Sequence, residues 1–294
     1  MQQQPAKHTY IADPENPAEM SRLTEQDRLV TAGMGGLFPE LGNTLPSTIV
    51  NIMDVGCGPG AWVLDTAFSF PDREVIGIDI SEIMINYARA RAKTQGLNNA
   101  IFMNANILEP LEFADGEFDL VNCRFAVGFL HRDKWPDVLR EFCRVLRPGG
   151  TLRLTEPLNF GDTNSPAINR LAQMLCQLFH LRGYGFASQV DAPYTYGIIN
   201  ILPDLLTTAC CDNIKTNQYV LDISYGTVFH GMQIKNYELV FDLLQGQFFQ
   251  HGLITKEDFD VVIDRVRFEG QKEDFRGTWQ HVTAWGQKSI PQPE

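Results

Sequence analysis

The order of apolar segments predicts an α/β protein built on one mostly parallel sheet of seven strands. Short apolar runs such as 48–54 and 74–79 have the length and composition of buried strands, segments of helical length separate them, and Gly/Pro turns mark the boundaries. Strands that alternate with helices pair in parallel, because the chain must cross back over the sheet between them. We therefore expect helices on both faces of the sheet.

The first half of the chain follows this alternation closely. Ser81 is a good helix N-cap and Gly96 a stop for the helix between them, and Pro148-Gly149-Gly150 ends another helix. We expect strands at 48–54, 74–79, 100–104, 118–123 and 151–155, and helices at 18–30, 61–70, 81–94 and 136–146.

The last third is less regular. Its apolar spacing predicts helices at 167–181, 202–210 and throughout 236–268, and a strand at 216–223. Residues 278–285 alternate like an edge strand and complete the count of seven. The helices inserted after strands five and six are expected to fold over the carboxyl edge of the sheet as a helical cap.

Composition narrows the classes of function. The chain carries 24 basic and 36 acidic residues, a net charge of −12, which disfavours binding to nucleic acid through a broad basic face. We find no apolar run of about 18 residues and no apolar leader, so we expect no membrane association and a cytoplasmic protein. The six cysteines form no CxxC pair and no histidines have H-x-x-x-H spacing, which predicts no metal site. We expect a monomer or a homodimer.

The strongest local signal is the glycine-rich run at 54–60, DVGCGPG, which lies between a buried strand and a helix. Glycines there let the backbone approach a ligand, and the helix that follows offers unpaired N–H groups. Gly56, Gly58 and Ala61 loosely fit a dinucleotide loop, and a tight turn without a ligand has the same composition. Asp54 favours a third interpretation, because a carboxylate suits a cationic ligand better than a pyrophosphate.

Asp79 closes the second strand, 23 residues after Gly56. That interval is close to the roughly 20 residues expected between a glycine loop and a ribose-binding acid. A carboxylate at this place can accept hydrogen bonds from both ribose hydroxyls. The alternative is an aspartate that merely caps the helix beginning near Ser81.

Over residues 46–156 the sequence resembles the class I S-adenosylmethionine-dependent methyltransferases. DVGCGPG, VIGIDIS, ANILEPLEFADGEFDLV and EFCRVLRPGGTLRLTEP occur in the order and at the spacings of that family. The resemblance implies a Rossmann-like cofactor-binding core at 46–160. An N-terminal arm and lid helix at 1–45 and a segment with the cap and last strands at 161–294 would complete one continuous catalytic domain.

The resemblance also implies roles for individual residues. S-adenosylmethionine would be the cofactor and S-adenosylhomocysteine the product, and Asn106 is a departure because many members have Asp there. Arg124 would pair with the cofactor carboxylate, or alternatively face solvent or bridge the core. The implied cofactor-binding residues are Asp54, Gly56, Cys57, Gly58 and Gly60 around the methionine end, Asp79 at the ribose, Ile80, Asn106 and Ile107 at the adenine, and Arg124.

The acceptor is expected to be a small molecule. The Asp/Asn-Pro-Pro-Tyr/Phe motif of nucleic-acid amino-methyltransferases is absent after strand four, where the chain reads Asn122-Cys123-Arg124-Phe125. The segment 123–133 resembles the small-molecule and ubiquinone-pathway type. Aromatic residues of the last third suit a flat organic acceptor, and they suit an ordinary hydrophobic core equally. The candidates for acceptor binding are Tyr10, Tyr184, Tyr194 and Tyr196.

His131 follows the fourth strand and is the candidate general base, with packing or surface exposure as the alternative. Methyl transfer from a sulfonium is a direct displacement, so alignment in a dry pocket can supply most of the rate. The sequence thus favours a methyltransferase acting on O, N or C of a small metabolite, and an aromatic metabolite is one option. An NAD-dependent oxidoreductase and a non-catalytic module that binds S-adenosylmethionine are the alternatives.

Replacing Asp79 with alanine tests the ribose assignment. Asp79→Ala is expected to weaken cofactor binding by roughly 1.5–3 kcal/mol, the scale of hydrogen bonds to a charged group. Isothermal titration calorimetry measures the change directly. Unchanged affinity would remove Asp79 from the ribose site.

Overall fold

The first five strands of the chain lie parallel in one sheet, in the order β3-β2-β1-β4-β5. The strand order reverses between β1 and β4, and such a reversal opens a crevice at the carboxyl ends of the two strands. The computed structural model describes residues 10, 16–188 and 193–290. The strands span Asn51–Val55 (β1), Glu74–Asp79 (β2), Ala100–Asn104 (β3), Phe118–Arg124 (β4) and Leu146–Pro157 (β5).

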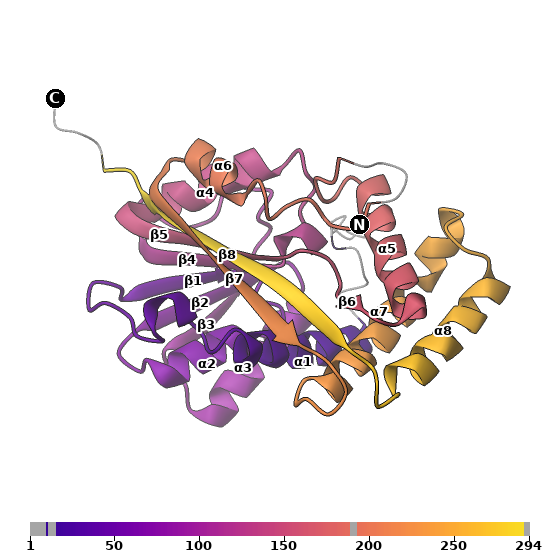
Figure 1. Ribbon diagram of the computed structural model, residues 1–294. Coiled ribbons are helices and arrows are strands. Elements are labelled where there is room, and N and C mark those ends of the chain that lie inside the picture. The colour runs from indigo at the N-terminus through magenta and orange to yellow at the C-terminus, as the bar shows by residue number, and fades with distance from the viewer. Residues whose placement is uncertain (1–9, 11–15, 189–192, 291–294) are drawn as a thin grey trace, which may run out of the picture.

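Helices cover both faces of this sheet (Figure 1). Helices α1, α2 and α3 lie on one face, and α4 and α6 lie on the other (Figure 1). Helix α4 illustrates how these helices pack, with one apolar face turned inward. Its buried residues recur at helical spacing and include Val138, Leu139 and Phe142, whereas Arg140 on the other face is exposed. The helices span Pro17–Gly33 (α1), Ala61–Ser69 (α2), Glu82–Gln95 (α3), Trp135–Val145 (α4) and Leu202–Ala209 (α6), with short 3-10 turns at Pro39–Leu41 (η1) and Ala126–Gly128 (η2).

The last third of the chain completes the sheet and caps one end of it. Strand β8 runs antiparallel to β5 on one side and to β7 on the other, so the sheet is continuous across the two halves of the chain. Helices α5, α7 and α8 lie beyond the end of the sheet (Figure 1). These elements span Asp162–Thr163 (β6), Pro166–Leu181 (α5), Cys211–Asp222 (β7), His230–Gln250 (α7), Lys256–Gly270 (α8) and Gly277–Lys288 (β8).

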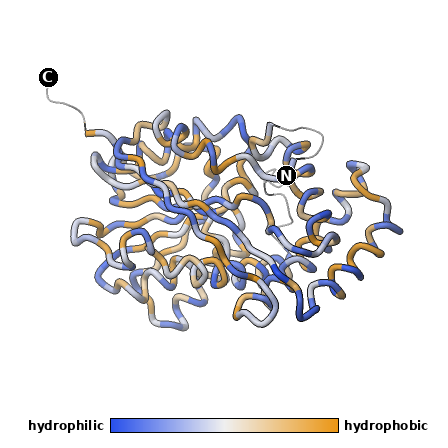
Figure 2. The backbone as a smooth tube through the Cα atoms, viewed as in Figure 1, coloured by the Kyte–Doolittle hydropathy of each residue, from blue (hydrophilic) through white to orange (hydrophobic). Residues whose placement is uncertain are grey.

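Strand β7 forms the open side of the sheet next to β8. Most of its side chains are exposed, and polar ones such as Lys215 and Asn217 are among them. Figure 2 shows this strand in largely hydrophilic colours, in contrast to the hydrophobic strands behind it. Polar and charged residues on an outer strand discourage pairing with another chain.

The architecture agrees with the sequence prediction apart from three details. The sheet has eight strands, not seven, because the two-residue strand β6 also pairs with β8. Residues 278–285 belong to a strand flanked by β5 and β7, so the edge prediction for them was wrong. The stretch 236–268 is two helices, because Gly252 adopts a left-handed φ of 65° and Thr255 caps the second helix. Over the described ranges, no helix has both the length and the apolar character to span a membrane.

Trp135 tests the packing of α4 against the sheet. Its side chain is fully buried, and its indole nitrogen donates a hydrogen bond to the carbonyl oxygen of Leu130 at 3.3 Å. Trp135→Ala should lower the free energy of unfolding by roughly 3–5 kcal/mol through the cavity it leaves. Phe68→Ala is the matched control, because Phe68 is 75% exposed. Urea denaturation of both variants measures the difference, and equal losses would contradict this packing.

Candidate functional site

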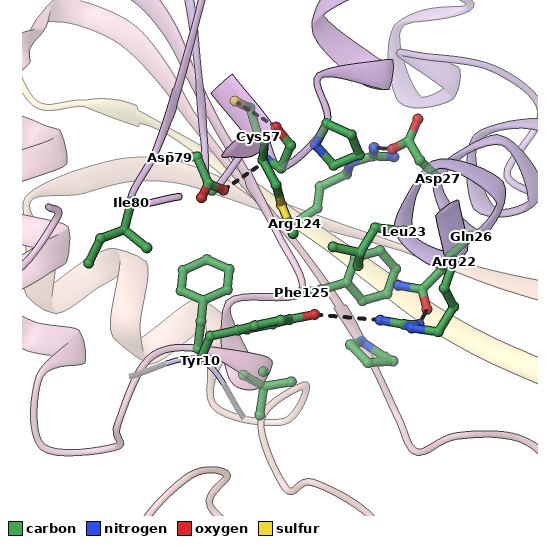
Figure 3. Close-up of a pocket in the computed structure, with 18 of the residues that line it drawn as sticks. Tyr10, Arg22, Leu23, Gln26, Asp27, Cys57, Asp79, Ile80, Arg124 and Phe125 are labelled. Atoms are coloured by element: carbon green, nitrogen blue, oxygen red, sulfur yellow. Dashed lines mark hydrogen bonds and ion pairs between the residues drawn. The ribbon is translucent and has the colours of Figure 1, made fainter. Parts of the chain in front are cut away.

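A cavity of about 210 Å³ lies at the carboxyl ends of β1, β2 and β4, beneath the cap. Its walls come from the glycine-rich turn after β1, the ends of β2 and β4, helix α1, and helices α5 and α7 of the cap. Figure 3 shows Asp79 and Cys57 on the sheet side, Arg22, Gln26 and Asp27 on helix α1, and Tyr10 across from them. The fold therefore brings the N-terminal helix and the cap against the strand ends.

The three glycines of the turn differ in how much space a side chain would have. Gly56, Gly58 and Gly60 all adopt positive φ, at 66°, 52° and 77°. A Cβ on Gly60 would lie 2.5 Å from the ring of Phe102, and a Cβ on Gly56 would lie 2.7 Å from that of Phe129. At Gly58 the nearest atom would be the sulfur of Met84, 3.7 Å away. Gly56 and Gly60 are thus required by packing, whereas a Cβ on Gly58 would meet its neighbours at ordinary van der Waals distance, where the turn borders the cavity.

Asp79 joins this turn to the end of β2. Its carboxylate accepts hydrogen bonds from the backbone N–H of Gly58 at 2.8 Å and from that of Ser81 at 2.9 Å. Burial raises the pKa of Asp79, and these backbone donors act against that rise. The N-cap of α3 is Ser81, whose hydroxyl accepts from the N–H of Met84. Asp79 lines the cavity, and a carboxylate with two donors retains lone pairs for a ligand.

Asp54 is the second carboxylate at the cavity. It is 4% exposed, and its Oδ1 accepts a hydrogen bond from the amide of Asn122 at 2.7 Å. Burial raises the pKa of Asp54 to about 7, against the lowering effects of Asn122 and Arg153. A cation placed beside it would stabilise the charged form. The site can therefore offer a buried negative charge to a cationic ligand.

Arg124, for which the resemblance implied a role at the cofactor carboxylate, lines the cavity and has a charged partner within the chain. Its guanidinium forms an ion pair with Asp27 of α1 and donates a hydrogen bond to the hydroxyl of Thr31 at 3.0 Å. Asp27 lines the same cavity, and sequence reasoning missed it. Acidic and basic groups side by side at a cavity wall suit an amino-acid group, which carries both charges.

A buried polar cluster continues along α1. Arg22 donates to both carboxylate oxygens of Glu19 at 2.7 Å each, to Gln26 at 2.6 Å, and to Asn236 of α7 at 3.0 Å. Tyr10 donates a hydrogen bond to the same Glu19. The cluster fastens the N-terminal helix to the cap. Glu19, Arg22 and Gln26 recur at helical spacing, and this polar stripe was the signal available in the sequence.

Aromatic rings form a further part of the cavity wall. Phe125 stacks on Trp279 with ring centres 6.3 Å apart, and Phe160 meets Trp279 edge-on at 5.8 Å. Phe179 of α5 packs against Tyr196 at 4.8 Å. Phe125 holds a left-handed φ of 59°, which is uncommon for a bulky residue and is the kind of strain found at functional sites. This part of the cavity suits an apolar, flat molecule.

The cavity does not gather every residue that the sequence singled out. Ile80, Asn106, Ile107, Tyr10 and Tyr196 line it, together with Cys57. The ring of His131 instead packs on Tyr184, 4.5 Å between centres, and next to Gly183. Tyr184 is fully buried in the core and Tyr194 is 65% exposed, and neither belongs to the described wall. The loop after β4 lines the cavity through Val127, Gly128 and Phe129, and His131 comes two residues later and is not among the lining residues.

These residues fit S-adenosylmethionine. Gly58 at the cavity wall, the carboxylate of Asp79 with lone pairs left for ribose hydroxyls, and the buried carboxylate of Asp54 match an adenosyl group that ends in a cationic amino acid. Ile80 and Ile107 offer flat apolar contact, and the amide of Asn106 accepts from the N–H of Leu108 and donates to Glu109. Within the described ranges, no group of three or more His, Cys, Asp or Glu side chains is placed to hold a metal ion.

Comparisons with known proteins agree with this assignment. Residues 52–150 match the family model described as a methyltransferase domain. A probable methyltransferase, ltbC, of Aspergillus luteorubrus is 35% identical over 135 residues, which are 44% of this chain and 46% of that protein. The demethylmenaquinone methyltransferase of Lactococcus lactis is 38% identical over 104 residues, 35% of this chain and 40% of that protein. The matched region thus spans less than half of these relatives.

Solved structures share the fold. The YcgJ protein of Bacillus subtilis aligns with a TM-score of 0.55 at 18% identity, over 87% of this chain and 98% of that one. Phosphoethanolamine N-methyltransferase 2 of Haemonchus contortus, solved with S-adenosylhomocysteine, aligns at 0.51 and 16% identity, over 86% of this chain and 52% of that one. Residues 52–150 therefore match a methyltransferase domain, and the chain shares its fold with these solved structures.

Gly58→Val tests the position of the ligand. The branched side chain would add bulk to the turn where Gly58 lines the cavity, and it should abolish cofactor binding by steric block. Gly96→Val is the matched control, because Gly96 also has a positive φ, at 69°, with nothing within 4 Å of its Cβ position, at the end of α3. Both variants should lose comparable backbone stability, and calorimetry should show loss of binding for Gly58→Val alone. Normal binding by Gly58→Val would place the ligand elsewhere.

Proposed function

We propose that the protein transfers the methyl group of S-adenosylmethionine to a small-molecule acceptor. The observation that carries the proposal is a pair of carboxylates that line the cavity, the buried Asp54 and the half-buried Asp79, on either side of a glycine turn that also lines it at Gly58. One carboxylate suits the ribose and the other suits the cationic amino-acid end. The methyltransferase domain matched at residues 52–150 supports the same function.

The cofactor would lie along the strand ends. Asp79 binds the ribose hydroxyls, while Ile80, Asn106 and Ile107 border the adenine. Asp54, with Arg124 and Asp27 on the α1 side, holds the amino-acid end. In this arrangement the reactive sulfur of the cofactor would lie between the glycine turn and the aromatic side chains of the cavity.

The acceptor would occupy the aromatic part of the cavity. Phe125, Phe160 and Trp279 exclude water there and present flat apolar surfaces, which favours an aromatic acceptor over a highly charged one. Burial raises the pKa of Tyr196, so its hydroxyl stays protonated and can donate a hydrogen bond to the acceptor. The atom that receives the methyl group, O, N or C, is left open by these residues.

S-adenosylmethionine, when bound, would supply a methyl group on a sulfonium: a nucleophilic atom of the acceptor bonds to the methyl carbon, the bond from that carbon to sulfur breaks, and S-adenosylhomocysteine is the leaving group. The protein's residues contribute to this step by orienting two reactants and by keeping water out. Holding reacting atoms in line is worth several kcal/mol, in the range of about 7–11 for the best-aligned reactions. The cap and α1 provide this enclosure, because Arg22 ties α1 to Asn236 of α7.

The oxidoreductase alternative would use the same glycine turn for a pyrophosphate. Asp54 is unfavourable for it, since a buried carboxylate beside the turn repels phosphate. A non-catalytic binding module would share the whole cofactor site, so turnover is the observation that separates it.

Titration with three ligands tests the proposal. The purified protein should bind S-adenosylmethionine and S-adenosylhomocysteine in the micromolar range and should not bind NADH. Incubation with methyl-labelled S-adenosylmethionine and a panel of phenols, amines and quinols should then transfer the label to at least one aromatic acceptor. Binding of NADH alone would overturn the proposal, and binding without transfer to any small molecule would favour the non-catalytic module.

A further inference from the structure

Three polar side chains form a row across the middle of the sheet. Asp54 on β1 is directly opposite Asn122 on β4, and Asn122 is directly opposite Arg153 on β5. Residues paired in this way project from the same face of a sheet. Glu40 of η1 lies at the far end of the row and pairs with Arg153.

Hydrogen bonds connect every neighbour in this row, which we call the Asp54 row (Asp54, Asn122, Arg153 and Glu40). The Asn122 amide nitrogen donates to Asp54 at 2.7 Å, and its amide oxygen accepts from Arg153 at 2.7 Å. Arg153 also donates to Glu40 at 2.5 Å. The side chains of Arg153 and Glu40 are each 2% exposed, and Asn122 is fully buried.

The chemistry of the row fixes the direction of each group. Asn122 lies between an anion and a cation, so its amide has one favourable orientation, with the nitrogen toward Asp54 and the oxygen toward Arg153. A buried arginine is costly unless it is paired, and Glu40 supplies the pairing charge. The row therefore holds Oδ1 of Asp54 toward the sheet interior.

The other oxygen of Asp54 is different. Oδ2 makes no hydrogen bond to any part of the chain that the structure describes, although Asp54 is almost completely buried and lines the cavity. The charged groups that act on Asp54 are Arg153 on β5 and Asp79 on β2, and Asp79 disfavours its ionisation. A buried carboxylate with one oxygen fixed and the other without a donor is ready to receive a cation.

We propose that Asn122, Arg153 and Glu40 are positioning residues that aim the free oxygen of Asp54 at the cationic amino group of S-adenosylmethionine. This inference rests on the proposed function, because it names what holds one end of the same cofactor. Glu40 and Arg153 act at a distance, since neither lines the described cavity. The competing account is structural: the row would only fasten η1 to the sheet.

A ligand pair separates these accounts. S-adenosylhomocysteine carries the amino-acid end, whereas 5′-methylthioadenosine shares the adenosine and lacks that end. Asn122→Ala should weaken binding of S-adenosylhomocysteine by about tenfold or more, the scale of one charged hydrogen bond, and leave 5′-methylthioadenosine within about twofold. A purely structural role would lower the melting temperature and leave the ratio of the two affinities unchanged.

The pH dependence gives a second readout. In the ligand-free protein the pKa of Asp54 is about 7, and a bound cation lowers that pKa. The affinity for S-adenosylhomocysteine should therefore rise between about pH 5.5 and 7. Asn122→Ala removes a donor that favours the charged carboxylate, so the midpoint of this rise should move to higher pH. Glu40→Gln leaves the charge of Arg153 unneutralised, so the midpoint should move to lower pH while affinity falls a few-fold.

Thr283→Val is the matched control, because it breaks a buried hydrogen bond to Thr155 in the same sheet outside the row. It should reduce stability without changing the affinity ratio or the midpoint. If Asn122→Ala does not fold, the affinity ratio and the pH midpoint of Glu40→Gln, at the other end of the row, distinguish the two accounts. A wild-type protein that binds neither ligand would overturn the proposed function and this inference together. Binding of both by the wild type, with an unchanged ratio and midpoint in the folded row variants, would overturn only the inference.

Discussion

Two carboxylates, Asp54 and Asp79, lie at one edge of a parallel sheet under an apolar cap. Burying a carboxylate costs free energy, and much of the site consists of hydrogen-bond donors that offset this cost. Burial raises the pKa of both groups, because a low-dielectric surrounding disfavours their charged forms. Asp79 is supported by backbone N–H donors of the turn and of α3, and Asp54 by the amide of Asn122. Such an arrangement costs stability in the free protein, and a cationic ligand with ribose hydroxyls offsets that cost.

The cap and the N-terminal helix are the second part of this arrangement. The polar cluster around Arg22 joins α1 to α7, and the pair of Arg124 and Asp27 joins α1 to the end of β4. Helix α1 is thereby linked both to the sheet and to the cap, next to the glycine turn. On the far side, Phe125 and Trp279 supply a dry aromatic wall. In the proposed function, a polar cofactor half and an apolar acceptor half of the cavity would meet inside one enclosure, which is what a direct displacement requires.

The sequence predicted the parts of the site that local chemistry determines. Asp54, Gly58 and Asp79 stand at the ends of apolar runs, and parallel strands bring their ends to one edge, so their proximity follows from the pattern. Asp27 was missed because a polar residue on an amphipathic helix is usually solvated, and only packing against β4 buries it. His131 was expected near the cavity from its distance along the chain; the loop through η2 does line the cavity, but the ring of His131 packs on Tyr184. The strands that pair with β8 could not be predicted from the sequence either. Alternation of apolar and polar residues shows which face of a strand is buried, but it does not show which strands lie beside it.

A crystal structure of the protein with S-adenosylhomocysteine tests the central claim most directly. The account predicts that the ligand's amino group lies within about 3.2 Å of the free oxygen of Asp54, with both ribose hydroxyls on Asp79. The ligand's sulfur should then face the aromatic wall formed by Phe125 and Trp279. An amino-acid end turned away from Asp54, or an adenosine bound outside the turn at Gly58, would contradict the account.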